Sequence, residues 1–125
     1  MDSPAPATVL IVEDEDFVRM VGSDILEYGG YRVLEAANAA EALRCLEADT
    51  GVKVLFTDVN MPGTPDGLGL AHLVHARWPA VRILVASGAA CPGPADLPEE
   101  GSFLRKPYRA DELLSRVATL TGSEH

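Results

Sequence analysis

Two patterns of hydrophobic residues alternate along the chain. Short unbroken apolar runs, such as Val9 to Val12, are typical of strands that are buried on both faces of a sheet. Polar residues or glycines end each run. We expect strands at residues 8–12 and 31–35, a third strand that ends at residue 58, and two more at 81–86 and 103–104.

The stretches between these runs have apolar residues at spacings of three and four, the pattern of a helix with one buried face. Gly29-Gly30 and Pro79 are expected to end two of these helices, and Asn38 is expected to cap the start of another. The four apolar stripes are Val18, Val21, Ile25 and Tyr28; Ala42, Leu43 and Leu46; Leu70, Ala71, Val74 and Trp78; and Leu113, Leu114, Val117 and Leu120.

Strands that alternate with helices predict an α/β fold: a doubly wound parallel sheet of five strands with helices on both faces, in three layers. The 125 residues suffice for one domain. We expect a flexible arm at residues 1–7, the domain at 8–121 and a tail at 122–125. The strand-to-helix loops of such a sheet lie at one edge, where the carboxyl ends of the strands meet.

The net charge of −9 argues against nucleic-acid binding, which needs clustered Lys and Arg. No apolar run is long enough to span a membrane, and residues 1–4 lack the basic and apolar regions of a signal peptide. We therefore predict a cytoplasmic protein that does not bind a membrane. Cys45 and Cys91 are far apart in the sequence, and in that compartment we expect two reduced thiols.

Acidic residues directly follow two of the predicted strands. Glu13 and Asp14 come after the first strand, and Asp58 ends the third. Three carboxylates at one edge provide hard oxygen ligands suited to Mg²⁺, which keeps several waters and takes one or two carboxylates. Asp14 or Asp16 could instead cap the helix that follows. We favour the metal site for Glu13 and Asp14, and the helix cap for Asp16.

Ser87-Gly88 and Lys106-Pro107 follow the last two predicted strands. The proline disfavours helical geometry at Lys106 and favours an extended or turn conformation. An ammonium at this edge would be a point charge suited to a phosphoryl oxygen. Ser87 could donate a hydroxyl hydrogen bond to the same oxygen, and Gly88 leaves space and a free N–H.

Other kinds of site lack their sequence patterns. There is no GxxxxGK[ST] loop for a nucleoside triphosphate, and Gly67-Leu68-Gly69 lacks the third glycine of a dinucleotide fingerprint. His72 and His75 stand three residues apart on a predicted helix, but no Cys or HExxH partner is near them. We expect them to be polar surface residues. Ser87 has no His and Asp partners in a recognisable triad.

Four short motifs occur in a fixed order along the chain: Glu13-Asp14, Asp58-Val-Asn-Met61-Pro62, Ser87-Gly88 and Lys106-Pro107. In this order and at these spacings they resemble the receiver domain of two-component response regulators. The resemblance covers nearly everything from Thr8 to Leu120. It implies a flavodoxin-like sheet with the strand order 2-1-3-4-5.

The resemblance also implies a role for each of these residues. Asp58 would be the nucleophile that accepts a phosphoryl group from the phosphohistidine of a histidine kinase or a phosphotransfer protein. Phe103 would be an aromatic switch residue that moves inward as Ser87 is drawn toward the phosphate. Mg²⁺, with Mn²⁺ as an alternative, would be held by Glu13, Asp14, Asp58 and the backbone carbonyl of Asn60. The phosphoryl oxygens would be bound by Asn60, Ser87, Gly88 and Lys106.

Such a protein is a phosphorylation switch and not an enzyme that turns over an outside substrate. Nothing after Ser123 is long enough for an output domain, so we expect the signal to pass to another protein, which the sequence does not name. One alternative is an interaction scaffold that phosphorylation does not regulate, although the complete set of site residues argues against it. Another is a Mg²⁺-dependent phosphatase with Asp58 as nucleophile, although Asn60 stands where its second acid would be.

Three features depart from the commonest family pattern. The loop Gly63-Thr64-Pro65 is slightly longer than usual, and Ser87 stands in place of the usual Thr. The prolines within residues 89–101 permit at most one or two helical turns there. We therefore expect weak or altered dimerisation through this segment, the fifth strand and the last helix, and so a monomer or a weak dimer. Similar truncated segments occur in receiver domains attached to hybrid histidine kinases, which favours a role in a phosphorelay.

Overall fold

The computed structural model describes residues 6–61, 65–88, 96–98 and 101–122. Its elements in chain order are β1 (Thr8–Val12), α1 (Asp16–Tyr28), β2 (Arg32–Ala36), α2 (Ala39–Ala48), β3 (Val52–Asp58), α3 (Gly67–Arg77), β4 (Arg82–Ser87), β5 (Ser102–Arg105) and α4 (Ala110–Thr121). The five predicted strands are all present, close to their predicted bounds. None of the described helices is both long and apolar enough to cross a membrane.

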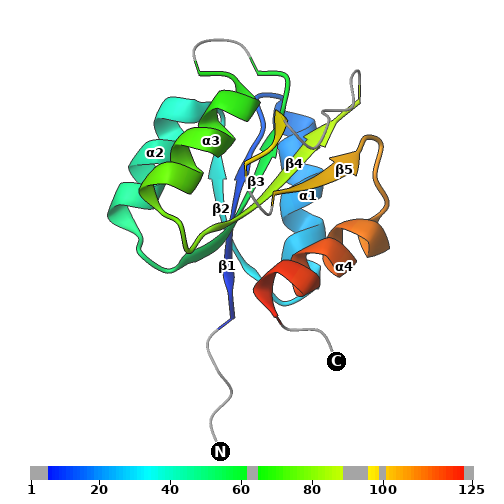
Figure 1. Ribbon diagram of the computed structural model, residues 1–125. Coiled ribbons are helices and arrows are strands. Elements are labelled where there is room, and N and C mark those ends of the chain that lie inside the picture. Colours follow the sequence, from blue (N-terminus) through cyan, green and yellow to red (C-terminus); the bar gives the residue numbers. More distant parts are fainter. Residues whose placement is uncertain (1–5, 62–64, 89–95, 99–100, 123–125) are drawn as a thin grey trace, which may run out of the picture.

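The five strands form one parallel sheet in the order β2-β1-β3-β4-β5. Helices α2 and α3 cover one face and α1 and α4 cover the other, which gives three layers (Figure 1). This is the doubly wound, flavodoxin-like fold that the sequence predicts. The carboxyl ends of all five strands lie at one edge of the sheet, the upper edge in Figure 1.

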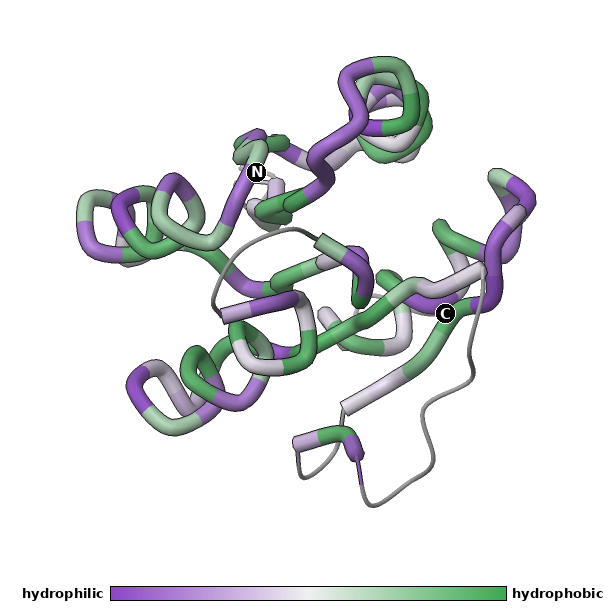
Figure 2. Tube along the Cα trace, turned by 90° about the horizontal axis from the view of Figure 1, so that it is seen from above, coloured by the Kyte–Doolittle hydropathy of each residue, from purple (hydrophilic) through white to green (hydrophobic). Residues whose placement is uncertain are grey.

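Each face of the sheet has its own hydrophobic core, because successive side chains of a strand point to opposite faces. Val9 and Ile11 of β1 pack under α1 and α4, whereas Leu10 and Val12 pack under α2 and α3. Figure 2 shows hydrophobic residues concentrated in the strands at the middle of the molecule, with hydrophilic residues mainly in the surrounding helices and loops. The unbroken apolar runs of the sequence follow from this burial on both faces.

The same alternation decides on which face the acidic residues of the upper edge lie. Glu13 comes two residues after Ile11, and Asp58 comes two residues after Phe56, and both of these apolar residues belong to the core under α1 and α4. The two carboxylates therefore lie on the face of α1 and α4.

The ends of β4 and β5 divide their polar residues between the two faces. Lys106 comes two residues after Leu104 and so lies on the face of α1 and α4, with the acids. Ser87 comes two residues after Val85 and lies on the opposite face, where Phe103 also packs. Position along the strands thus groups Lys106 with the carboxylates, and Ser87 with Phe103.

The apolar stripe predicted for α1 only partly packs against the core: Ile25 contacts it, but the other large residues of the stripe do not form the buried face. Val21 is 38% exposed and Tyr28 is 89% exposed, while the residues that α1 buries include Gly22 and Leu26. A Cβ atom added at Gly22 would lie only 2.5 Å from Cδ1 of Ile11. The helix approaches the sheet through small residues, which a search for large apolar side chains does not detect.

The prediction that Asp16 caps α1 is also wrong. Glu15 occupies the N-cap position without a side-chain cap, and Asp16 is the first helical residue and pairs with Arg19 at 2.7 Å. The prediction for α2 is confirmed, because the side chain of Asn38 accepts a hydrogen bond from the N–H of Glu41 at 2.9 Å. Helices α2, α3 and α4 bury most of their predicted stripes.

Several predictions concern residues outside the described part of the chain: most of the arm and tail, residues 62–64 of the loop after β3, and residues 89–95 and 99–100 of the proline-rich segment. Cys91 is among them, whereas Cys45 has a free thiol. The described residues 96–98 form no α-helix. Leu97 packs against the core under α2 and α3, and His72 of α3 makes a hydrogen bond with the backbone oxygen of Asp96 at 2.8 Å.

Helix α3 begins in close contact with the end of β3. The N–H of Gly67 donates to the carbonyl of Val59 at 3.1 Å. A Cβ atom added at Gly67 would lie 1.7 Å from the backbone oxygen of Asp58. Such a clash is with backbone, so it cannot be relieved by a change of side-chain rotamer. Only glycine allows the helix to start this close to the acidic edge.

Gly67→Ala is therefore expected to lower the free energy of unfolding by at least about 2 kcal/mol, because overpacking against rigid backbone forces the helix away from β3. Chemical denaturation followed by circular dichroism measures the change. Gly51→Ala is the matched control, since an added Cβ there would meet only a side-chain oxygen of Asp49, at 3.1 Å. Equal stabilities of the two variants would contradict the steric explanation.

Candidate functional site

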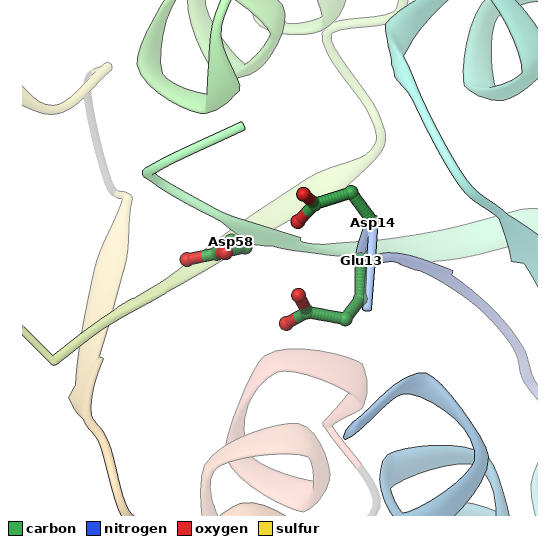
Figure 3. Close-up of side chains that lie close together, drawn as sticks. All are labelled: Glu13, Asp14 and Asp58. Carbon is green, nitrogen blue, oxygen red and sulfur yellow. The ribbon is translucent and has the colours of Figure 1, made fainter. Parts of the chain in front are cut away.

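Three carboxylates meet at the upper edge of the sheet, as the sequence predicts. Glu13 and Asp14 directly follow β1, and Asp58 is the last residue of β3. Figure 3 shows the side chains of Glu13 and Asp14 turned toward the side on which Asp58 lies. Each residue offers an oxygen within 4.8 Å of those of the other two. Glu13 and Asp58 are buried, whereas Asp14 is exposed.

Lys106 places its ammonium between the two buried acids. Its Nζ donates a hydrogen bond to Oε1 of Glu13 at 2.8 Å and lies 3.4 Å from Oδ2 of Asp58. The N–H of Lys106 also donates to the carbonyl of Ser87 at 2.9 Å, which continues the pairing of β4 with β5 by one residue. The predicted cation thus lies at the predicted edge, in a bend beyond the end of β5.

Burial and charge act in opposite directions on these groups. Burial raises the pKa of Glu13, and repulsion from Asp58 adds to this effect, although the hydrogen bond from Lys106 opposes it. Burial alone would lower the pKa of Lys106, but the two neighbouring carboxylates outweigh it and raise the pKa. The lysine is therefore a cation at neutral pH, and it is the partner of two buried acids at once.

A second group of polar atoms lies beside Asp58. The N–H of Asn60 donates to Oδ1 of Asp58 at 3.3 Å, and Nδ2 of Asn60 lies 3.5 Å from Oγ of Ser87. Gly88 is exposed next to Lys106, since a Cβ added there would lie 3.4 Å from Cβ of the lysine. The structure thus brings the four residues predicted to bind phosphoryl oxygens to the same edge.

Phe103 lies on β5, paired with Val85 of β4. Its ring is partly buried against the core under α2 and α3, on the same face as Ser87. Its backbone oxygen accepts a hydrogen bond from Arg116 of α4. Its predicted role as a moving switch residue stays a prediction, as do the roles assigned to the other site residues.

Two features of the site were not predicted from the sequence. Arg19 of α1 donates from Nη1 to the backbone oxygen of Glu13 at 2.7 Å. A groove of about 520 Å³ also opens beside Lys106, between α1 and the loop that joins β5 to α4. Its lining is mostly apolar and includes Phe17, Val21 and Tyr108. In the sequence, only the spacing of three between Asp16 and Arg19 indicates that Arg19 has a partner near the site. Most of the apolar residues of α1 that line the groove were expected to face the core, so the sequence did not indicate a groove.

The donor set fits Mg²⁺. All three acids offer carboxylate oxygens, the ligand type that Mg²⁺ and Mn²⁺ prefer, and they lie at the ends of two neighbouring strands. The exposed position of Asp14 leaves room for the waters that Mg²⁺ retains. Burial is the main cause that raises the pKa of Glu13, and repulsion from Asp58 adds to it; a divalent cation would relieve that repulsion.

Comparisons with known proteins agree on one family. A family model described as the response regulator receiver domain matches residues 9–118. The chain is 39% identical over 120 residues to the sensor kinase CckA of Brucella abortus (strain 2308), and the match covers 93% of this chain and 13% of that protein. It is 35% identical over 126 residues to the response regulator protein FleR of Pseudomonas aeruginosa, covering 94% of this chain and 26% of that protein.

A solved structure gives the same result. The response regulator receiver domain protein from Clostridium thermocellum is 25% identical and superimposes with a TM-score of 0.80, over 93% of this chain and 94% of that one. By contrast, the chain spans about a quarter of the length of FleR and less than that of CckA. The similarity therefore concerns one domain of those longer relatives.

Mg²⁺ is expected to stabilise the protein, because a ligand that binds only the folded state shifts the unfolding equilibrium. At ten times the dissociation constant the gain is about 1.4 kcal/mol. Asp14→Asn should remove most of this gain, whereas Asp111→Asn, an exposed acid on α4, should keep it. Thermal unfolding with and without Mg²⁺ measures the difference. An equal gain in wild type and Asp14→Asn would contradict the assignment.

Tyr108 provides a prediction about alkaline pH. Burial raises the pKa of its phenol above the ordinary value of 10.0, and its ring packs edge-on against Phe56 at 5.6 Å between centroids. Above pH 10 the unfolded chain releases this proton first, so stability is lost as the pH rises toward the pKa of the folded state. Tyr108→Phe should flatten this loss in denaturation curves, whereas Tyr28→Phe should not, since Tyr28 is exposed. The same alkaline loss in all three proteins would rule out Tyr108 as its source.

Proposed function

Because the chain belongs to the response regulator receiver family, we propose that it is a phosphorylation switch in which Asp58 accepts a phosphoryl group from a phosphohistidine. The donor would be a histidine kinase or a histidine phosphotransfer protein. The main observation in support is that the Asp58 carboxylate lies beside both a cation, Lys106, and an acidic pair suited to Mg²⁺.

In the proposed reaction a carboxylate oxygen of Asp58 attacks phosphorus. The bond from phosphorus to the imidazole nitrogen breaks, and its electron pair stays on the imidazole, which leaves as neutral histidine if its other nitrogen holds a proton. The product is an acyl phosphate on Asp58. The protein mainly positions the reactants and neutralises charge, as in other phosphoryl transfers. Bound Mg²⁺ would supply part of that neutralisation.

Lys106 would supply the rest of the neutralisation. Its Nζ already lies 3.4 Å from Oδ2 of Asp58, so a phosphoryl group on that carboxylate would lie within reach of the ammonium. The hydroxyl of Ser87, the amide of Asn60 and the N–H of Gly88 stand nearby as further donors. In this proposal the protein turns over no outside substrate and only promotes its own phosphorylation and dephosphorylation.

The switch would link Ser87 to Phe103. The two side chains lie on the same face of the sheet, and Phe103 pairs with the residue two positions before Ser87. Phosphorylation adds negative charge and acceptor oxygens beside Asp58 and would draw the Ser87 hydroxyl toward them. The vacated space would let the half-buried Phe103 ring turn inward, which changes the surface of β5 and α4 that a downstream protein meets.

The donor would dock in the groove beside Lys106. Lys106 and Gly88 line both this groove and the phosphoacceptor site, so an occupant of the groove is held next to Asp58. Phe17, which is 70% exposed, gives the groove an apolar wall, and Glu15 adds an acidic rim. These features fit an amphipathic helix that bears the phosphohistidine, an apolar stripe and basic flanks.

The similarity to a sensor kinase favours a place in a phosphorelay, in which the phosphoryl group passes on to another histidine. A monomer or a weak dimer in the cytoplasm, with a protein as the downstream partner, is part of this proposal.

The proposal is tested by intact mass after incubation with acetyl phosphate or a phosphoramidate, with and without Mg²⁺. We expect a Mg²⁺-dependent gain of one phosphoryl group, lost in Asp58→Asn. Asp66→Asn is the control, because Asp66 is an exposed acid near the site that caps α3 through the N–H of Gly69 at 2.9 Å. No gain in a protein that binds Mg²⁺ would favour the unregulated scaffold, and release of phosphate from added phosphomonoesters at many turnovers would favour the phosphatase.

A further inference from the structure

We propose that Arg19 is a positioning residue that holds the Glu13–Asp14 peptide in the orientation needed for metal binding. This inference rests on the proposed function, since it concerns the same Mg²⁺ site. Arg19 touches neither Asp58 nor the Asp14 side chain through any described contact, and it acts on the peptide that joins Glu13 to Asp14. Its side chain is largely covered, with 17% of it exposed.

All three nitrogens of the Arg19 guanidinium have a partner. Nη1 donates to the backbone oxygen of Glu13 at 2.7 Å, and Nη2 donates to Oδ1 of Asp16 at 2.7 Å. Nε donates to Oε1 of Glu35 on β2 at 3.2 Å. The side chain therefore ties the end of β1 to the first turn of α1 and to the neighbouring strand.

Hydrogen bonds hold the backbone on both sides of Glu13. The N–H of Glu13 donates to the carbonyl of Ala36 at 3.0 Å, which holds the peptide before it. The Arg19 contact holds the peptide after it, and that peptide also contains the nitrogen of Asp14. The directions of both carboxylates depend on this one peptide plane, because each side chain starts from a carbon bonded to it.

Arginine suits this position because its planar fork donates in several directions at once. An effect of Arg19 on backbone geometry and an effect of its charge would change Mg²⁺ binding in opposite directions. Removal of a positive charge near three acids should tighten Mg²⁺ binding if charge alone mattered, since Asp16 and Glu35 would then add to the negative field. Removal of a positioning contact should weaken Mg²⁺ binding. The sign of the change therefore decides between the two.

The test is Mg²⁺ titration calorimetry on folded wild type, Arg19→Met, Arg19→Lys and Glu35→Gln, with metal-free melting curves for each. We expect Arg19→Met to weaken Mg²⁺ binding about tenfold, the low end for residues that orient metal ligands. Arg19→Lys, which keeps the charge and loses the fork, should also bind more weakly than wild type. Glu35→Gln keeps the contact with Glu13 and should stay within about twofold of wild type, since only an exposed charge is lost.

Equal or tighter Mg²⁺ binding in Arg19→Met would overturn the proposal, even if its metal-free melting temperature falls. If Arg19→Met does not fold, Arg19→Lys decides by the same criterion. Loss of affinity in Glu35→Gln as large as in Arg19→Met would also overturn it, because the ion pair and not the Glu13 carbonyl would then matter. Failure of wild type to bind Mg²⁺ would instead reject the metal site of the proposed function, and the role of Arg19 with it.

Discussion

The ammonium of Lys106 between the carboxylates of Glu13 and Asp58 is the interaction on which the site depends. With Asp14, the three acids have a formal charge of −3 and Lys106 has +1, which leaves a formal charge of −2. Without the lysine, the two buried carboxylates would be strongly disfavoured as anions. With it, the remaining charge is what one divalent cation balances. The proposed metal binding and the proposed acceptance of a phosphoryl group would both follow from this incomplete neutralisation.

The sheet supplies this arrangement, because the charged groups come from three strands that are distant in sequence. Lys106 and Glu13 are 93 positions apart and meet only when β1, β3, β4 and β5 are assembled in parallel. The alternation of side chains then places Asp58 on the same face as both. The close approach of Gly67 to the backbone of Asp58 keeps the acidic edge compact. The packing that stabilises the fold is thus also the packing that brings like charges together.

The strands and the composition of the acidic edge could be predicted because they depend on residue type and on position at a strand end. Apolar runs require burial within the sheet, and a carboxylate that directly follows such a strand therefore lies at the edge of the sheet. The packing face of α1 could not be predicted, since it depends on the close approach that Gly22 permits. The prediction that Asp16 caps α1 was wrong, and the carboxylate of Asp16 instead accepts a hydrogen bond from Arg19. The contact of Arg19 with Glu13 could not be predicted, because it involves a backbone atom that no side-chain pattern reveals.

A crystal structure with Mg²⁺ and beryllofluoride, a mimic of the phosphoryl group, would test the charge balance most directly. We expect Mg²⁺ bound by oxygens of Asp14 and Asp58, the beryllofluoride on Asp58, and Nζ of Lys106 within hydrogen-bonding distance of a fluorine. Lys106 still paired only with Glu13 and Asp58, with no cation among the three carboxylates and no adduct on Asp58, would contradict the account.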